Sequence, residues 1–157
     1  MAIRFGRLVI DDAYGPEVAP VEQRWRIEYW QGGNWATNTA DGCTSLGLDG
    51  DVDLIGDGGT SPGDATVTLR DSGGTGDTSI TSGDLGFTSG TATVVYDEPG
   101  KDERGWIGVA TDLGTDHDHL LIDDNDNTGP DSDGDDTKTD NDGPYDADPS
   151  ARVTFGI

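Results

Sequence analysis

The sequence predicts an all-β protein, an antiparallel β-sandwich of the immunoglobulin-like or Greek-key type with long Asp- and Gly-rich loops. Of 157 residues, 25 are Gly and 7 are Pro, and only 31 % are hydrophobic. That composition disfavours helices and suits strands joined by turns. Short segments also alternate between apolar and polar residues, with Gly-, Ser- and Thr-rich stretches between them. Residues 1–157 are long enough for one domain with a hydrophobic core, and we expect this domain to be a piece of a larger precursor.

The clearest predicted strand is Gln23–Trp30, with the sequence QRWRIEYW. Trp25, Ile27 and Tyr29 share one face and charged residues fill most of the other, which is the period of a half-buried strand. The sequence QGGN at Gln31–Asn34 then predicts a hairpin turn. Further strands are expected at Ile3–Ile10, Asn34–Asn38, Ala65–Asp71, Thr91–Gly100, Arg104–Asp112, His119–Ile122 and Ala151–Ile157, with a turn at Asp11–Pro20 and an irregular segment at Asp41–Asp64.

The charge of the chain excludes one class of partner. The formal net charge is −23 and the sequence pI is about 4.1, with 2 Lys and 7 Arg. Proteins bind nucleic acids and anionic membrane surfaces through Lys and Arg side chains. This chain has few of them, so it is predicted to bind neither partner. No apolar run approaches the ~18 residues of a membrane span, so no membrane insertion is expected. The N-terminus also lacks the pattern of a signal peptide, so if the chain is exported, its signal lies elsewhere.

The acidic residues are almost all aspartate, 27 Asp against 5 Glu. Asp holds its carboxylate close to a turning backbone, which is what calcium loops require, whereas a solvated, halophile-like surface is the alternative. The densest stretch is Asp123–Gly143. We predict calcium as the bound ion, with ligands among Asp124, Asp126, Asp131, Asp133, Asp135, Asp140 and Asp142, and in a second cluster among Asp49, Asp51 and Asp53.

The stretch is not an EF-hand, although DSDGDD begins like one at Asp131. Asp136 stands where an EF-hand loop has Gly, and Asp142 stands where it has Glu. The alternate-residue spacing nevertheless lets several carboxylates converge on one ion. Two carboxylates about 4 Å apart repel by roughly 4 kcal/mol at an effective dielectric near 20, so such a loop needs counter-charge to pack closely.

Other candidate sites are weaker. The sequence DHDH at Asp116–His119 could supply zinc or copper ligands, although solvated loop residues are the simpler interpretation. No nucleophile elbow, phosphate loop or dinucleotide motif is present, so we predict no enzyme and no catalytic residues. Trp30 and Trp35 flank the QGGN turn and either bind a sugar or pack across the hairpin. Cys43, the one cysteine, is either a buried free thiol or is bonded to a missing part of the chain or to another subunit.

Both ends of the chain resemble the uncharacterised domain at the C-terminus of MshQ-like proteins. That family has an R-[FY]-G-R strand, an AYG turn, a strand that ends in EYW and an N…CT segment. Its domain ends in an Asp-rich stretch followed by DPSARATFGIY. The matching parts of this chain are Arg4–Arg7, Ala13–Gly15, Glu28–Trp30, Asn38 with Cys43–Thr44, and the final DPSARVTFGI at Asp148–Ile157.

The resemblance implies a secreted β module of the machinery of mannose-sensitive haemagglutinin type IV pili in Gram-negative bacteria. We therefore expect an extracellular, calcium-stabilised structural or adhesive module of a surface appendage, without enzymatic activity. Its expected partners are copies of itself or other pilus and adhesin subunits, and surface glycans. Family members continue past FGI with a further strand, so assembly by strand complementation is a further expectation, and a truncated fragment is the alternative. A calcium-dependent carbohydrate-binding module is the alternative function.

Overall fold

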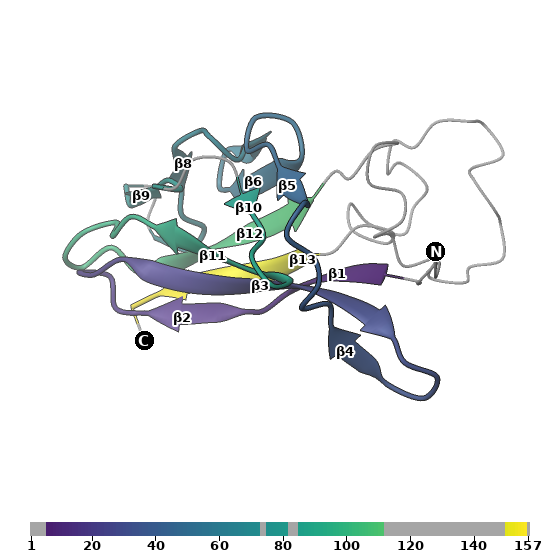
Figure 1. Ribbon diagram of the computed structural model, residues 1–157. Helices are drawn as coiled ribbons and strands as arrows, with labels where there is room; N and C mark the ends of the chain where they lie inside the picture. Colours follow the sequence, from purple (N-terminus) through teal and green to yellow (C-terminus); the bar gives the residue numbers. More distant parts are fainter. Residues whose placement is uncertain (1–5, 73–74, 82–84, 112–149, 157) are drawn as a thin grey trace, which may run out of the picture.

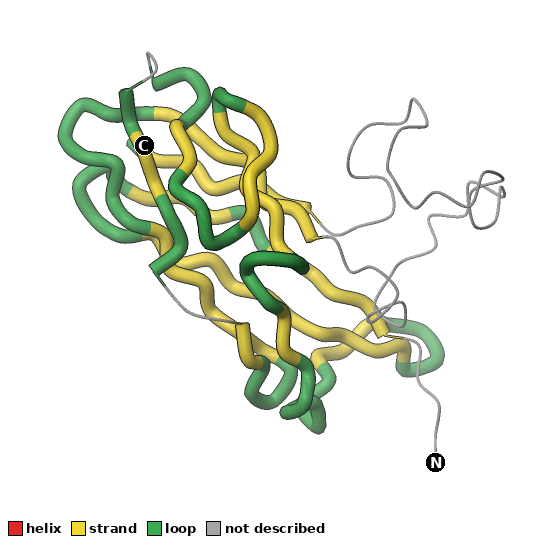
Figure 2. The backbone as a smooth tube through the Cα atoms, turned by 90° about the horizontal axis from the view of Figure 1, so that it is seen from above, coloured by secondary structure: helices red, strands yellow, loops and turns green. Residues whose placement is uncertain are grey.

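All regular secondary structure in the described part of the chain is β-strand (Figures 1 and 2). The computed structural model describes residues 6–72, 75–81, 85–111 and 150–156. Across those ranges no helix is present, which confirms the predicted all-β class. The strands are β1 (Gly6–Ile10), β2 (Ala13–Gly15), β3 (Val21–Trp30), β4 (Trp35–Thr37), β5 (Ser45–Leu46), β6 (Val52–Gly56), β7 (Gly59–Pro62), β8 (Val67–Thr68), β9 (Asp77–Thr78), β10 (Leu85–Gly86), β11 (Thr91–Tyr96), β12 (Gly105–Thr111) and β13 (Ser150–Phe155).

The longer strands form two sheets that pack into a sandwich (Figure 1). The first sheet has the order β1-β3-β11, with β4 also paired to β3, and all of its pairs are antiparallel. The second has the order β2-β13-β12-β6-β7 and is antiparallel except for the β2–β13 pair, which is parallel. Two small sheets, β5 with β10 and β8 with β9, complete the set. The two-sheet sandwich agrees with the sequence prediction.

The strand order within the two sheets is immunoglobulin-like. In that fold the second and fifth strands, B and E, are neighbours in one sheet, while strands C, F and G are neighbours in the other. Here β3 and β11 take the places of B and E, and β6, β12 and β13 take those of C, F and G. The first strand divides between the sheets, because β1 pairs with β3 and β2 pairs with β13. Strand pairing therefore supports the immunoglobulin-like assignment.

The core lies between the two sheets, and Trp25 on β3 is its largest fully buried side chain. Alternate residues of β3 point inward, as the sequence pattern predicts. Burial of this apolar surface is the main stabilising contribution to the fold. The other core residues are Leu8, Ile10, Ala13, Val21, Ile27, Leu46, Leu48, Val52, Leu54, Val67, Leu69, Ile80, Leu85, Phe87, Val94, Tyr96, Ile107, Val109, Val153 and Phe155.

A buried polar network runs through this core. The Gln23 side-chain carbonyl accepts hydrogen bonds from Trp25 Nε1 at 3.0 Å and from the Tyr96 hydroxyl at 2.7 Å. The Gln23 amide donates to the Asp11 carbonyl oxygen at 2.9 Å. Burial raises the pKa of the Tyr96 hydroxyl strongly, so it remains a donor at physiological pH. One glutamine thus joins the first sheet's two neighbouring strands, β3 and β11, to the segment that follows β1.

Two segments that the sequence predicted as turn or irregular structure contain strands. The segment Asp41–Asp64 carries β5, β6 and β7, and Asp11–Pro20 carries β2. The run Val52–Gly56 is buried at four of its five positions, because it lies between β7 and β12 inside the second sheet. Asp and Gly residues stand on both sides of this short run, so the sequence shows no alternation of apolar and polar residues long enough to predict a strand. Conversely, the strand predicted at Ala65–Asp71 shrinks to Val67–Thr68 with an isolated bridge at Arg70.

Candidate functional site

Thr111 and Ser150, the described residues that flank the acidic segment, lie at the same end of the second sheet as the turn that carries Asp49 and Asp51. Val52 on β6 pairs with Thr111, the last described residue of β12. Ala110 on β12 pairs with Ser150, the first residue of β13. Residues 112–149 therefore leave and rejoin the sandwich on adjacent strands, beside the turn that carries Asp49 and Asp51. The predicted ligands in this segment lie outside the described residues: Asp124, Asp126, Asp131, Asp133, Asp135, Asp140 and Asp142.

In the second cluster, Asp51 has a defined structural contact. Its Oδ2 accepts a hydrogen bond from the Gly47 amide at 2.6 Å, and the Asp51 amide donates to the Gly47 carbonyl oxygen at 2.8 Å. A Cβ atom at Gly47 would lie 3.2 Å from Asp49 Oδ1 and 3.6 Å from Asp51 Oδ2. Both carboxylates thus lie over the same turn, and a glycine leaves them room.

Asp53 belongs to β6 rather than to that turn, and it pairs in register with Ala110 and Pro62. Among the residues whose placement is described, no three His, Cys, Asp or Glu side chains are close enough to hold a metal ion. The described part alone therefore brings Asp49, Asp51 and Asp53 into no three-carboxylate group. Calcium binding remains a prediction that depends on the acidic segment.

The two tryptophans of the β3–β4 hairpin pack against each other. Trp30 and Trp35 are paired across the hairpin, and their ring centroids lie 5.6 Å apart in an edge-to-face arrangement. The Arg7 guanidinium lies 4.3 Å from the centroid of the Trp35 ring. Packing across the hairpin, one of the two predicted interpretations, is confirmed. Trp30 nevertheless remains 46 % exposed on a hairpin that projects from the sandwich (Figure 1).

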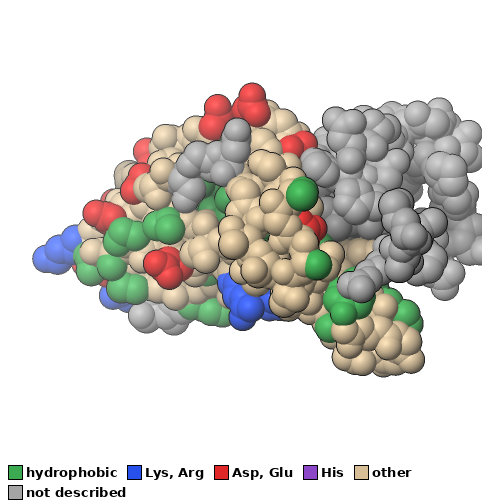
Figure 3. Space-filling view, viewed as in Figure 1, with side chains coloured by type: hydrophobic (Ala, Val, Ile, Leu, Met, Phe, Trp, Pro, Cys, Tyr) green, Lys and Arg blue, Asp and Glu red, His purple; other side chains and the backbone are tan. Residues whose placement is uncertain are grey.

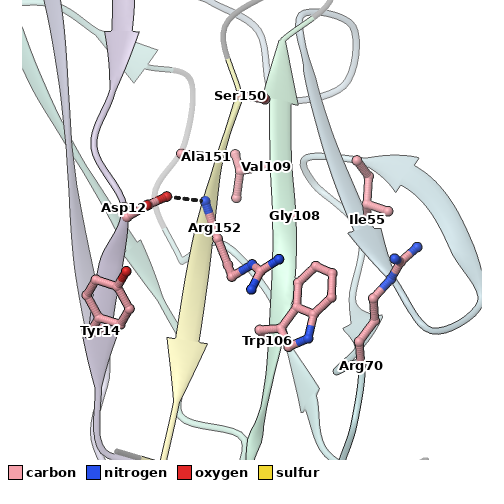
Figure 4. A pocket seen from close by; sticks show the side chains of 10 residues that line it. All are labelled: Asp12, Tyr14, Ile55, Arg70, Trp106, Gly108, Val109, Ser150, Ala151 and Arg152. Carbon is pink, nitrogen blue, oxygen red and sulfur yellow. Dashed lines mark hydrogen bonds between the residues drawn. The ribbon is translucent and has the colours of Figure 1, made fainter. Parts of the chain in front are cut away.

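The outer face of the second sheet carries a shallow open hollow of about 420 Å³, which the sequence did not predict (Figure 4). Trp106 on β12 lies at its centre, between two arginines. The Arg152 guanidinium is 4.0 Å from the centroid of the Trp106 ring, and the Arg70 guanidinium is 5.1 Å from it. We name this feature the Trp106 hollow; its lining residues are Asp12, Tyr14, Ile55, Arg70, Trp106, Gly108, Val109, Ser150, Ala151 and Arg152.

Backbone and side-chain contacts fix the centre of the Trp106 hollow. Arg70 and Trp106 exchange backbone hydrogen bonds of 2.9 and 3.1 Å, and Arg70 Nε donates to the Gly56 carbonyl oxygen at 3.1 Å. Trp106 Nε1 donates to Asp71 Oδ2 at 2.9 Å. Asp71 has a φ of +65°, a left-handed conformation that is uncommon for a residue with a side chain. The local backbone therefore holds the indole ring and one guanidinium in place.

The floor and wall of the Trp106 hollow come from neighbouring strands. Gly108 pairs with Arg152 on one side and with Ile55 on the other, and its lack of a side chain leaves the floor open. Tyr14 on β2 is 62 % exposed and stands at the wall. Asp12 Oδ1 accepts a hydrogen bond from the Arg152 backbone amide at 2.8 Å. A ligand would therefore meet an aromatic ring and two guanidinium groups.

Two arginines of the first sheet, Arg7 and Arg26, have carboxylate partners, in contrast. Arg7 and Arg26 both contact Glu28, at 2.6 and 3.3 Å, and Arg26 also contacts Asp11 at 2.5 Å. These two cations enclose Glu28, whose side chain is only 11 % exposed, so a charged residue is tolerated in a largely buried position. No carboxylate in the described ranges lies within 4.0 Å of the Arg70 or Arg152 guanidinium. Among the described residues, the two arginines of the Trp106 hollow are therefore less neutralised than Arg7 and Arg26.

The remaining sequence predictions have mixed outcomes. Cys43 is an exposed free thiol and is not buried. Its backbone amide donates to Asp41 Oδ1 at 3.2 Å, because Asp41 closes the turn over Cys43 and Thr44. The sequence DHDH lies outside the described residues. No helix in the described ranges is long and apolar enough to cross a membrane. In the view of Figure 3, Asp and Glu side chains are spread over the visible face, whereas Lys and Arg are visible at only a few places.

Comparisons with known proteins identify the family but no function. Among solved structures, the M1 domain from titin is similar, with 11 % sequence identity, a TM-score of 0.32, and coverage of 98 % of this chain and 93 % of that one. A likeness this low adds nothing to the fold assignment, which depends on the strand pairing described above. No curated protein matches the chain. The family model of DUF6701, fourth domain, matches residues 4–157. The chain therefore belongs to the DUF6701 family as a fourth domain.

Proposed function

We propose that this domain is a non-enzymatic, extracellular structural and adhesive module of a bacterial surface appendage, stabilised by calcium. The observation that supports it best is the position of Thr111 and Ser150, which flank the acidic segment, beside the turn that carries Asp49 and Asp51. Residues 112–149 contain 14 Asp; they follow Thr111, the last residue of β12, and precede Ser150, the first residue of β13, which pairs with Ala110. A closed loop with that much negative charge repels itself, and each calcium ion would neutralise two charges.

The surface and pilus assignment depends on the MshQ-like resemblance of the two chain ends. An immunoglobulin-like sandwich is a common architecture of cell-surface domains, although fold alone does not define function. Extracellular modules bind calcium with a Kd of roughly 0.1–1 mM. That affinity suits the calcium concentration outside cells and is too weak for a cytosolic calcium signal. On this proposal the acidic segment binds calcium when the domain reaches an exterior rich in calcium.

Calcium is expected to stabilise the domain. At 10 mM calcium, one site with a Kd of roughly 1 mM contributes about 1.4 kcal/mol, which for a chain of this size raises the Tm by about 3–6 °C. Differential scanning calorimetry in calcium and in EDTA measures the difference. The double variant Asp133→Asn/Asp135→Asn should lose most of the calcium-dependent shift.

A matched double variant, Asp57→Asn/Asp102→Asn, removes the same charge elsewhere. Asp57 follows β6 and Asp102 precedes β12, so both lie at the opposite ends of these strands from Val52 and Thr111. This control should keep the full calcium shift. Identical melting curves of the unmodified domain in calcium and in EDTA would reject the calcium part of the proposal.

Self-assembly by strand complementation is the second part of the proposal. In the described part of the chain, β13 is paired on both sides, with β12 and with β2, so the position beside β12 is already filled. A donated strand would have to add at an outer edge; the first sheet ends in β1 and β11, and the second in β2 and β7. We expect sedimentation velocity at micromolar concentration to reveal species larger than the monomer. A single monomeric boundary would contradict this part.

A calcium-dependent carbohydrate-binding module is the second candidate function. The exposed Trp30 favours it, because a half-exposed indole on a projecting hairpin offers a face for a sugar ring. Under this alternative, saccharide binding requires calcium and is lost in Trp30→Ala. The calcium-stabilised structural module predicts neither calcium-dependent saccharide binding nor an effect of Trp30→Ala on such binding.

A further inference from the structure

The Trp106 hollow has more hydrogen-bond donors than acceptors. A guanidinium group carries five N–H donors and no acceptor. Arg70 uses one of them on the Gly56 carbonyl oxygen, and the Arg152 guanidinium makes no hydrogen bond to a residue in the described ranges. Among the residues that line the hollow, Asp12 is the one with a carboxylate. One of its oxygens already accepts a hydrogen bond from the Arg152 backbone amide. A complementary ligand therefore brings acceptor oxygens, and a carboxylate matches the planar fork of a guanidinium best.

The cationic groups are held in position before any ligand arrives. Trp106 Nε1 is hydrogen-bonded to Asp71, and both guanidinium groups stack on the Trp106 ring (Figure 4). Stacking on an indole restricts an arginine side chain and keeps its N–H edges available. The ordering cost that a ligand must overcome is correspondingly lower. The arrangement is a prepared anion site and not a chance meeting of surface charges.

Tyr14 adds a recognition element beside the guanidinium groups. Its side chain is 62 % exposed and belongs to β2, the strand next to the one that carries Arg152. Binding sites of small ligands combine an apolar or aromatic surface with a few fixed polar groups. A pyranose ring presents an apolar face to an aromatic side chain and carries its substituents at the rim. A sugar whose substituent is a carboxylate satisfies both the tyrosine and the arginines.

We propose that the Trp106 hollow binds a short acidic saccharide, with a uronate carboxylate on Arg152 and Arg70 and a sugar ring on Tyr14. The net charge of −23 repels long polyanions, so the ligand carries few charges and places one carboxylate in the hollow. The two guanidinium groups would hold the carboxylate without a metal ion, so we expect this binding to be independent of calcium. The inference therefore goes beyond the calcium-stabilised module and does not depend on it.

Isothermal titration calorimetry with trigalacturonate tests the inference on the complete domain. We expect saturable binding of one trisaccharide per chain, in calcium and in EDTA alike, at a temperature below both melting transitions. The methyl ester of the same trisaccharide lacks the charge and should bind at least about tenfold more weakly, because a charge-assisted hydrogen bond contributes at least that factor. Acetate should also bind more weakly, because it lacks the ring. Equal binding of acetate and trigalacturonate would overturn the saccharide assignment.

Two variants locate the site. Arg152→Gln should weaken binding about tenfold, and Tyr14→Ala should weaken it measurably while leaving the fold intact, because Tyr14 is largely exposed. Arg24→Gln removes the same charge from an exposed position on the first sheet and should leave the affinity unchanged. Circular dichroism confirms folding of each variant. Unchanged affinity in both site variants, or loss of binding in Trp30→Ala instead, would overturn the inference.

The outcomes of this titration and of the calcium melting experiment are independent. A domain that gains stability in calcium but shows no heat with trigalacturonate contradicts only the saccharide site. A domain that binds the trisaccharide but melts identically in calcium and in EDTA contradicts only the calcium proposal.

Discussion

Gln23→Leu is expected to reduce the free energy of unfolding by about 3–5 kcal/mol, although leucine has nearly the volume of glutamine. The substitution leaves Trp25 Nε1, the Tyr96 hydroxyl and the Asp11 carbonyl oxygen without their partner. Gln23, Trp25 and Tyr96 are each at most 1 % exposed, so water cannot replace it. Each buried polar group without a partner costs about 1–3 kcal/mol. Urea unfolding followed by tryptophan fluorescence measures the loss, because Trp25 is fully buried in the folded state.

Two further variants isolate the network from side-chain volume and hydrophobicity. Tyr96→Phe removes one hydroxyl and leaves Gln23 with two of its partners, so its cost should be only about 1 kcal/mol. Gln31→Leu makes the same chemical change at an exposed turn position and should shift the stability by no more than about 0.5 kcal/mol. Equal effects of Gln23→Leu and Gln31→Leu would show that the buried network contributes nothing to stability.

Gly105→Ala is expected to cost about 3 kcal/mol, the second large effect, despite adding a single methyl group. A Cβ at this position would lie 2.2 Å from the Arg70 carbonyl oxygen and 3.0 Å from Leu69 Cβ. A backbone carbonyl cannot move aside as a flexible side chain can, so the bridge between Arg70 and Trp106 must open. The Tm should fall by roughly 6–12 °C in a thermal melt.

The matched control is Gly86→Ala, because a Cβ at Gly86 meets no atom within 4 Å. Its stability should stay the same or rise by a few tenths of a kcal/mol, since alanine lowers the entropy of the unfolded chain. Gly105→Ala should also weaken trigalacturonate binding, because it displaces Arg70 from the Trp106 ring. A Gly105→Ala domain that melts within about 1 °C of the original would show that the sheet accommodates the methyl group.

Local sequence pattern predicted those strands whose two faces differ in polarity. The segments QRWRIEYW, RGWIGVATD and ARVTFGI alternate clearly, and each contains a strand: β3, β12 and β13. β6 was missed because four of its five residues are buried, so it has no polar face to alternate with. β2 was missed because a strand of three residues beside a proline looks like a turn. Composition and period thus predicted the fold class, while the short and fully buried strands required tertiary contacts.

The Trp106 hollow could not be predicted because its lining residues come from segments far apart in the chain. Asp12, Arg70 and Arg152 meet through strand register, and no local spacing encodes that register. A partial signal was nevertheless present in RGWIGVA, where Trp106 and Gly108 occupy the outward positions of the predicted strand. A tryptophan next to a glycine on the outer face of a sheet predicts one of two arrangements. Either the indole ring packs over the glycine, or the space above the glycine stays open as a hollow. Sequence alone could not decide between these two possibilities before the neighbouring strands were known.

The register between Ala110 and Ser150 has an evolutionary consequence. A segment that departs and returns at neighbouring positions of two paired strands can change its length and composition while the two strands keep their pairing. Lengthening such an insert is inexpensive, since each doubling of its length costs only about 0.6 kcal/mol of closure entropy. Relatives of this domain are therefore free to diversify at this position, as antibodies do in their third hypervariable loop, while the sandwich beneath stays constant.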